Sequence, residues 1–313
     1  MARREAGWDE GGEPAIEVED LVVRYGRQKA VDGLSISVPR GSVYAFLGPN
    51  GAGKTTTIKT LMGFRGSDGG QARVLGHDVA EESLQVRARV GYVGETRSLY
   101  GYMTARGHGK LCRSLGTRWD QGLFERKLEL FRIPPGVKAR KLSKGQKAQL
   151  ELCLALGGDP ELLILDEPAS GLDPAARQKL LKVIVDLAAE ERTVFFSTHV
   201  LSDVEAVADM AGIIESGRLV VGDEIDCLRE THKVFRLVYA EEPPDEELRL
   251  LRYLPDVLDV EKEGRGVRLQ IRGEAEAVRK ILEERPYRLL DVDCGGMSLE
   301  EIFLRYVEAD DDR

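Results

Sequence analysis

Residues 43–55 read VYAFLGPNGAGKT, an apolar run followed by a glycine-rich turn and a lysine–threonine pair. The stretch from Gly48 to Thr55 matches the phosphate-loop pattern G-x-x-x-x-G-K-[ST]. The apolar run predicts a buried strand, and the residues from Lys54 to Gly63 predict a helix. Because glycine lets the backbone approach closely and a helix N-terminus carries partial positive charge, this arrangement can surround a phosphate. We expect the nucleotide phosphates to be bound by Gly48, Pro49, Asn50, Gly51, Ala52, Gly53, Lys54, Thr55 and Thr56.

A second apolar run, LLIL at residues 162–165, ends at the acid pair Asp166 and Glu167. Side chains at the carboxyl end of a buried parallel strand point into the crevice where ligands bind. We expect Asp166 and the Thr55 hydroxyl to hold Mg²⁺, and Glu167 to act as general base on the attacking water. An isolated acid pair is often only a solvated turn, but Lys54 and Thr55 upstream favour the catalytic interpretation.

Residues 140–151, RKLSKGQKAQLE, supply a second possible anion site. Ser143 and the neighbouring backbone amides precede a helix predicted from Lys147, and such a helix start can hold an anion. The sequence alone does not say which anion a second site would bind when the phosphate loop already exists.

The pattern along the chain predicts an α/β fold with a separate C-terminal domain. Residues 15–228 alternate apolar strands with helices, as in a parallel sheet covered on both faces, with a mainly helical segment over residues 97–157. Residues 229–313 read as strand, helix, strand, strand, helix, strand, which is the α+β ferredoxin-like order. A last helix begins at Ser298, where Glu301 completes a capping box. Residues 1–14 are expected to be a flexible tail.

Composition excludes several classes of protein. A formal net charge of −9 argues against a general nucleic-acid binder. The four cysteines are far apart and form no C-x-x-C pair, which is typical of reduced cytosolic thiols rather than a zinc site. The N-terminus lacks the apolar segment of a secretory signal, and no stretch approaches the roughly 18 apolar residues of a membrane span.

The motif order GPNGAGKTT, LSKGQ, LLILDEP, SGLD and STH resembles the nucleotide-binding subunit of an ATP-binding cassette (ABC) transporter over roughly residues 16–228. The C-terminal domain resembles the extension of bacterial cassettes that pair with separate export permeases. The resemblance implies a P-loop, Mg²⁺-dependent ATPase that lies on the cytoplasmic face of the membrane and powers an exporter. It also implies a homodimer or heterodimer of cassettes with ATP between them. Ser143, Gly145 and Gln146 would then hold the γ-phosphate of the ATP bound to the opposite subunit.

The resemblance assigns three further roles. Tyr25, in the early hairpin, matches the aromatic residue that stacks on adenine. His199 matches the switch histidine that contacts the γ-phosphate, and Asp173 matches the loop that communicates across the dimer. Taken alone, Tyr25 and His199 would more often be an ordinary surface residue and a partly buried histidine.

Two positions depart from the family pattern. Glu95 stands where the family usually has glutamine; its carboxylate can still bind Mg²⁺ and contribute to catalysis, but it adds negative charge near the γ-phosphate. A surface glutamate on a loop is the alternative. Lys144 replaces the first glycine of L-S-G-G-Q, and lysine would be strained there if the position required a positive φ.

The segment from Arg97 to Met103 is expected to be helical. Its residues Leu99, Tyr100, Tyr102 and Met103 suggest a groove for a permease helix, with ordinary subdomain packing as an equal alternative. Two other functions remain: a soluble cassette ATPase acting on ribosomes or DNA, and a sensor that barely hydrolyses ATP. The sequence shows neither the second cassette typical of ribosome-acting relatives nor the long coiled-coil insertion of the DNA-repair type. Glu167 argues against the sensor, because a cassette that does not hydrolyse ATP would be expected to lack this base.

Overall fold

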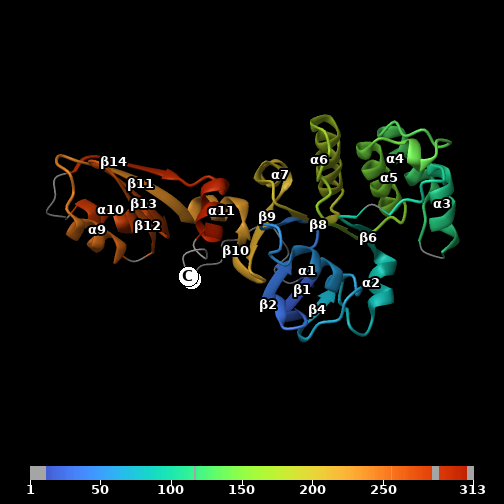
Figure 1. Ribbon diagram of the computed structural model, residues 1–313, viewed down its shortest axis with the longest axis horizontal. Coiled ribbons are helices and arrows are strands. Elements are labelled where there is room, and N and C mark those ends of the chain that lie inside the picture. The colour runs from blue at the N-terminus through green and yellow to red at the C-terminus, as the bar shows by residue number, and fades with distance from the viewer. Residues whose placement is uncertain (1–11, 97, 116–117, 255, 284–288, 309–313) are drawn as a thin grey trace. The chain divides into compact units, whose positions relative to one another are not determined.

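The computed structural model describes residues 12–96, 98–115, 118–254, 256–283 and 289–308 (Figure 1). The chain divides into two compact units between Gly222 and Asp223. The first unit contains β1 (Ile16–Tyr25), β2 (Gln28–Val38), β3 (Val43–Leu47), α1 (Lys54–Leu61), β4 (Gly69–Val74), β5 (His77–Asp78), α2 (Ser83–Arg89), β6 (Val90–Val93), α3 (Ala105–Ser114), α4 (Gln121–Leu130), a 3₁₀ turn (Ala139–Lys141), α5 (Lys144–Leu156), β7 (Leu162–Leu165), α6 (Pro174–Ala189), β8 (Thr193–Thr198), α7 (Leu201–Val207), β9 (Met210–Glu215) and β10 (Arg218–Glu224), whose last two residues fall in the second unit. The second continues with α8 (Ile225–Thr231), β11 (His232–Tyr239), α9 (Asp245–Arg252), β12 (Val257–Glu263), β13 (Gly266–Arg272), α10 (Ala275–Glu283), β14 (Leu289–Gly296) and α11 (Leu299–Glu308).

Two sheets organise the first unit. One has the strand order β10-β9-β3-β8-β7-β6, with parallel pairing from β9 through to β6, and the other has the order β2-β1-β4-β5. The strands β3, β7 and β8 are buried along their whole length, as the continuous apolar sequences of β3 and β7 predict. The α/β prediction is therefore confirmed for this unit.

The two faces of the six-stranded sheet are covered differently. Figure 1 shows α5, α6 and α7 on one side, and α1 with the antiparallel sheet on the other. Side chains from β1, β2, β3, β8 and α1 form one buried cluster, which includes Ile16, Phe46, Ile58 and Phe195. This cluster fixes β3 and α1, the two elements that flank the phosphate loop.

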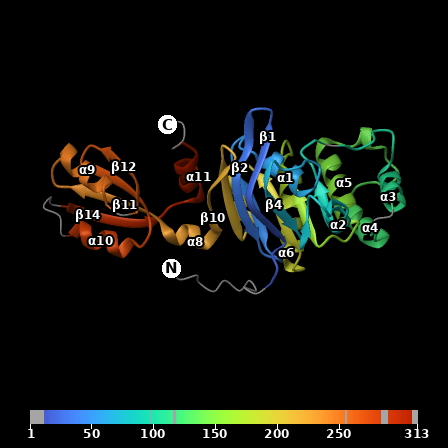
Figure 2. The same ribbon diagram turned by 90° about the horizontal axis from the view of Figure 1, so that it is seen from below.

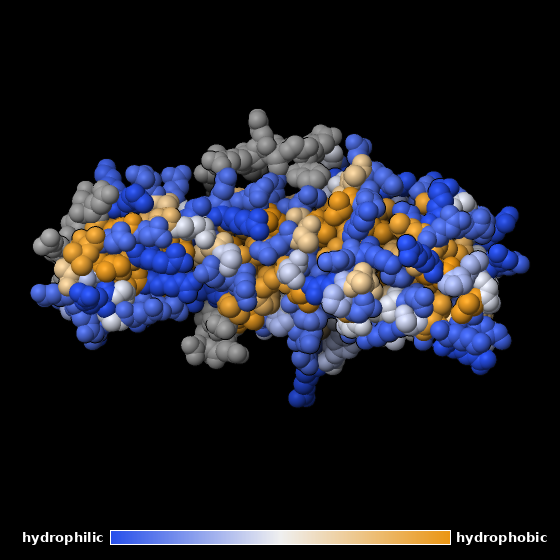
Figure 3. All heavy atoms as spheres, turned by 90° about the horizontal axis from the view of Figure 1, so that it is seen from above, coloured by the Kyte–Doolittle hydropathy of each residue, from blue (hydrophilic) through white to orange (hydrophobic). Residues whose placement is uncertain are grey.

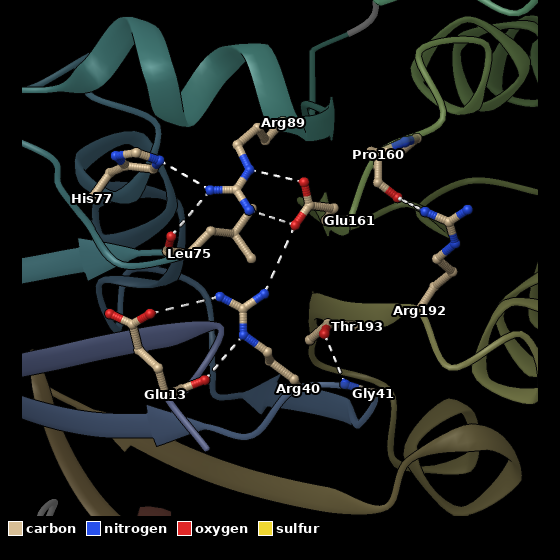
Figure 4. Close-up of polar contacts among 10 residues, drawn as sticks. All are labelled: Glu13, Arg40, Gly41, Leu75, His77, Arg89, Pro160, Glu161, Arg192 and Thr193. Carbon is tan, nitrogen blue, oxygen red and sulfur yellow. Dashed lines mark hydrogen bonds and ion pairs between the residues drawn. The ribbon is translucent and has the colours of Figure 1, made fainter.

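Charged side chains join the elements at the amino ends of the parallel strands, away from the phosphate loop. Glu161 precedes β7, and its carboxylate accepts bonds of 2.8 and 2.6 Å from the Arg89 guanidinium just before β6 (Figure 4). Arg40 lies 3.8 Å from the same carboxylate and donates to the Glu13 carbonyl oxygen. His77 Nε2 lies 3.0 Å from Arg89, which adds β5 to the network.

The helical region departs from expectation in two places. Residues 98–103 do not form the expected helix; Arg97 lies outside the described residues. The backbone of this segment bonds instead to the segment before α5: Ala139 N donates to the Met103 carbonyl, and Arg140 N to that of Gly101. These long-range bonds replace the local ones that a helix would need. Helix α5 begins at Lys144, three residues earlier than expected, because Ser143 caps it.

The second unit has the ferredoxin-like topology. Its four strands have the order β12-β13-β11-β14 with antiparallel neighbours, and α9 and α10 connect them in the predicted sequence. The core includes Phe235, Leu251, Leu269 and Val278. The expected capping box is present, since Glu301 N donates to Ser298 Oγ and Ser298 N donates to Glu301 Oε2. Figure 2 shows α10 beside the strands of this unit.

Candidate nucleotide site

The phosphate loop lies between buried β3 and α1, and two of its glycines are required by close packing. A Cβ atom built on Gly48 would lie 2.4 Å from the Ile214 carbonyl oxygen. Gly53, the residue before α1, has φ 110°, and a Cβ there would lie 2.4 Å from the Ala30 carbonyl oxygen. Only glycine fits these positions without displacing backbone. The loop is thereby held at the N-terminus of α1, where an anion is favoured.

Lys54 is buried within this loop. Its ammonium donates to the carbonyl oxygens of Gly48 at 2.6 Å and Pro49 at 2.9 Å, and it lies 3.3 Å from Glu167 Oε1. The Lys54 and Glu167 side chains are 5% and 10% exposed, so their charges interact with little screening by water. The other carboxylate oxygen of Glu167 lies 2.9 Å from His199 Nδ1. Three residues from three separate motifs thus form one connected set.

The backbone at Glu167 is strained, because this residue has φ 48° although it is not glycine. Its backbone N–H donates to Ser197 Oγ at 2.9 Å. A residue held in this region of φ is common at active sites, where the surrounding structure fixes a conformation that costs about 1 kcal/mol or more.

Asp166 is 1% exposed and lies beside Glu167 at the end of β7. Its Oδ1 accepts from Ser197 Oγ at 2.8 Å and from Thr55 Oγ1 at 3.2 Å, whereas its buried Oδ2 accepts no hydrogen bond. Burial raises the pKa of Asp166, and the negative charges of Glu95 and Glu167 raise it further, against the two hydroxyl bonds. A buried carboxylate with one unsatisfied oxygen and an adjacent hydroxyl suits a hard cation such as Mg²⁺.

Among the described residues, no group of three or more His, Cys, Asp or Glu side chains is arranged to hold a metal. Mg²⁺ in an ATP site is usually held by one or two protein groups together with phosphates and water. Asp166 and Thr55 are the two protein groups that the geometry offers.

Glu95 is exposed and follows β6. With Glu167, Gln149 and Leu152 it lines a pocket beside the acid pair. The negative charge of Glu95 is near enough to raise the pKa of Asp166, so Glu95 lies within electrostatic range of the acid pair. Its proposed contact with Mg²⁺ remains a prediction.

Tyr25 is the last residue of β1 and is 49% exposed. The guanidinium carbon of Arg65 lies 3.9 Å from the centre of its ring, and Arg65 also donates to the Arg24 carbonyl oxygen. The Tyr25 ring is therefore an accessible flat surface, one face of which carries a cation–π contact. The structure alone does not place adenine on it.

The signature residues form a second cluster around the starts of α5 and α6. Ser143 Oγ accepts from Gln146 N at 3.1 Å, while the Gln146 side chain accepts from Ser143 N at 3.0 Å. Asp173 caps α6 by accepting from Ala176 N at 2.9 Å, and a Cβ on buried Gly145 would lie 3.6 Å from Asp173 Oδ2. Among the described residues, no hydrogen bond of Ser143 or Asp173 reaches Lys54 or Thr55.

The backbone conformation at Lys144 does not require glycine, although the family pattern has glycine at this position. It is the first residue of α5 and is absent from the described residues with positive φ, so the strain considered from the sequence does not arise. Its ammonium lies over Gly171 of the SGLD turn, since a Cβ built on Gly171 would be 1.9 Å from Lys144 Nζ. The side chain therefore spans the two turns of the signature cluster.

Ser197 is a residue of the site that the sequence analysis did not predict. It binds Asp166 through its hydroxyl and Glu167 through the backbone N–H, and so holds both acids in place. The STH motif could have pointed to this residue, because the motif begins with Ser197, two residues before His199. Ser197 also lies on the strand next to the one that ends at the acid pair. Only the pairing of β8 beside β7 shows that it faces them.

A phosphate loop whose lysine reaches a buried glutamate, next to a strand-end aspartate, defines a P-loop nucleotide-hydrolysing cassette. Residues 31–170 match the family described as ABC transporter. The bacitracin transport ATP-binding protein BcrA of Bacillus licheniformis is 32% identical over 93% of this chain and 97% of its own. The Nod factor export ATP-binding protein I of Paraburkholderia xenovorans is 36% identical over 69% of this chain and 75% of its own. A solved ATP-binding subunit of an ABC transporter has a TM-score of 0.63 at 31% identity, and the match covers 69% of this chain and 92% of that one.

The chain belongs to the ABC transporter family as an ATP-binding subunit, and it is an ATPase. No helix in the described part of the chain has the length and apolar character needed to cross a lipid bilayer.

Proposed function

We propose that this ATPase powers an exporter, with Glu167 as general base and Asp166 and Thr55 as the protein groups that hold Mg²⁺. The observation that carries the proposal is the connected set formed by Lys54, Glu167 and His199 beside the unsatisfied Oδ2 of Asp166. Bound Mg²⁺ would supply charge neutralisation at the β- and γ-phosphates. The export role is supported by the relatives, whose names describe transport and export; they give no support to a role on ribosomes or DNA.

Lys54, Glu167 and His199 have different roles in the proposed hydrolysis. ATP phosphates offer stronger acceptors than the Gly48 and Pro49 carbonyl oxygens, so the Lys54 ammonium turns toward the β- and γ-phosphates when ATP binds. Glu167 Oε1, no longer beside the ammonium, accepts a proton from the attacking water. His199 keeps the other Glu167 oxygen in place through its 2.9 Å contact and presents its Nε2 edge to the γ-phosphate.

Two cassettes complete each ATP site. A solved bacterial ABC transporter cassette of the same fold is dimeric, and we propose that this chain likewise dimerises and works with a permease. Ser143, Gly145 and Gln146 would meet the γ-phosphate of the nucleotide held by the opposite subunit, which is a second copy of this chain or a similar cassette. The Ser143 hydroxyl and the first amides of α5 provide the donors. The γ-phosphate contacts both subunits, so hydrolysis weakens the dimer.

Residues 98–103 are proposed to contact the permease at the inner face of the cell membrane. Tyr100 and Tyr102 are 51% and 67% exposed, and their rings lie 5.8 Å apart. An exposed aromatic pair next to the Glu95 loop is suited to receive a partner helix. Movement of that helix would then reach the ATP site through Glu95, which lines one pocket with Glu167.

The direct test is the steady-state ATPase rate of Glu167→Gln, with Glu190→Gln as a control at an exposed position of the same type. Loss of a general base lowers the rate by about 100-fold or more while nucleotide binding persists. An unchanged rate in Glu167→Gln would contradict the assignment. A wild-type rate no higher than that of Glu167→Gln would support the sensor hypothesis instead.

A further inference from the structure

Positive charge is concentrated in two segments of the helical region, although the whole chain carries a net charge of −9. Residues 98–119 and 130–150 contain no aspartate or glutamate. They contain ten basic residues: Arg106, Lys110, Arg113, Arg118, Arg132, Lys138, Arg140, Lys141, Lys144 and Lys147. An uneven distribution of this kind produces a local positive field in an acidic protein.

Three of these residues form a stripe along α3. Arg106, Lys110 and Arg113 are spaced i, i+4 and i+7, so they lie on one face of the helix, and all three are exposed. The opposite face is packed, because Ala105 and His108 are buried. Helix α3 therefore turns its cationic side to the solvent.

The segment before α5 extends this stripe. Thr104 pairs with Lys138 in an isolated β-bridge, and Arg106 N donates to the Pro135 carbonyl oxygen at 3.0 Å. These bonds place exposed Lys138, Arg140 and Lys141 beside the start of α3. We call the six residues the basic face: Arg106, Lys110, Arg113, Lys138, Arg140 and Lys141. None of the ion pairs found between described residues includes any of the six.

We propose that the basic face binds the anionic headgroups of the membrane that holds the permease. The proposal rests on the proposed function, because the basic face is continuous with the segment proposed to contact the permease and would face the same bilayer. The exposed rings of Tyr100 and Tyr102 adjoin it, and tyrosine is favoured at the boundary between lipid and water. Figure 3 shows mostly hydrophilic residues over the α3–α5 end, with hydrophobic residues exposed between them.

The distribution of charge favours lipid over an acidic protein segment. Recognition of one carboxylate or one phosphopeptide uses a guanidinium fork held in fixed geometry. The basic face instead spreads six long side chains over two segments, without ion-pair partners among the described residues that would hold them. A headgroup layer offers many phosphates in no fixed position, and each basic residue near it strengthens binding about fivefold.

Co-sedimentation of the whole protein with vesicles tests the proposal. The probe is phosphatidylglycerol mixed into phosphatidylcholine, compared with phosphatidylcholine alone, at low and high salt. We expect binding only to the anionic vesicles, weakened by salt. The variant with Arg106→Gln, Lys110→Gln and Arg113→Gln should bind roughly 100-fold more weakly. A control with Arg249→Gln, Arg279→Gln and Lys280→Gln removes three exposed charges from helices of the second unit and should bind like wild type.

Three outcomes would overturn the proposal: equal binding to neutral and anionic vesicles, equal losses in the two triple variants, or no loss in the α3 variant. If the α3 variant instead loses co-purification with the permease while it keeps vesicle binding, the basic face binds protein rather than lipid. ATPase rate without vesicles should be the same in both triple variants and wild type, which shows that the variants fold. Failure of the general-base assignment would appear in that rate and not in vesicle binding, so the two proposals can fail separately.

Discussion

The Lys54 ammonium lies 3.3 Å from Glu167 Oε1 in a site where neither side chain is more than 10% exposed. Lys54 in the phosphate loop and Glu167 after β7, 113 residues apart in sequence, thus place an ammonium next to a carboxylate. Each charge offsets the cost of burying the other, because a lone buried charge is strongly unfavourable. The pair holds both groups close to the positions in which the proposed reaction uses them.

Removal of the ammonium should weaken ATP binding and hydrolysis together. Lys54→Met deletes a charged donor to the phosphates, and we expect ATP affinity to fall roughly 10- to 100-fold. Fluorescent-nucleotide titration measures the affinity. Lys59→Met, at an exposed position in the last turn of the same helix, should leave it unchanged; comparable loss in both variants would show a general effect on α1 instead.

The negative charge of Glu95 should be visible in the pH dependence of hydrolysis. Burial is the main cause of the raised pKa of Asp166, and the negative charge of Glu95 raises this pKa further. Glu95→Gln removes that charge, so the pKa of Asp166 falls and Asp166 stays ionised at lower pH. The acid limb of the ATPase pH profile should therefore move to lower pH. A limb that does not move, or that moves upward, would contradict the electrostatic coupling; Glu125→Gln serves as the control.

The Tyr25 ring should contribute to affinity through its flat surface and not through its hydroxyl group. We expect Tyr25→Phe to bind ATP normally and Tyr25→Ala to bind it roughly 10- to 100-fold more weakly, since base stacking on aromatic rings has this magnitude. Isothermal titration calorimetry measures both. Tyr253→Ala, which removes an exposed ring from the second unit, should have no effect. Equal affinity of the Phe and Ala variants would argue against stacking.

The Glu161–Arg89 pair should stabilise the fold at neutral pH. The Arg89 guanidinium lowers the pKa of Glu161 below its ordinary value of 4.5. The contribution of the pair to the free energy of unfolding is therefore complete above pH 4.5. It is lost as the pH falls through the lower pKa that Glu161 has in the folded state. At pH 7, Glu161→Gln should reduce the free energy of unfolding by about 1–2 kcal/mol, with the partial exposure of the pair taken into account.

Urea denaturation at several pH values measures this effect. Asp293→Asn, which breaks the exposed pair with Arg236, should cause no measurable change. A loss in Glu161→Gln that persists unchanged well below pH 4.5 would point to packing rather than charge as its cause.

Local patterns predicted most of the fold. Strand β7 has the bounds expected from its sequence, because a short buried apolar run is specified locally. The helix predicted around Tyr100 was wrong, because the backbone of this segment bonds to residues 139–140, which no local pattern reveals. Ser197 and Arg65 were missed for the same reason: their roles arise from contacts made between elements.

The central claim is that the phosphate loop of one subunit and the signature turn of the other form a single ATP site. Ser143→Arg should block ATP-driven dimerisation yet spare ATP binding, and equal loss of both would argue against this arrangement. Asp120→Ala removes a comparable cap from α4 and should keep activity, so loss of an N-cap alone does not explain the effect.

The most direct measurement mixes the Ser143→Arg chain with the Lys54→Met chain and records ATPase activity. Each variant alone lacks one half of every site. In a mixed dimer, the intact phosphate loop of the first faces the intact signature turn of the second. Because ATP closes only the mixed dimers, and each of these keeps one intact site of two, we expect up to about half of the wild-type rate. Activity no greater than that of the two variants assayed separately would contradict a site shared between two copies of this chain.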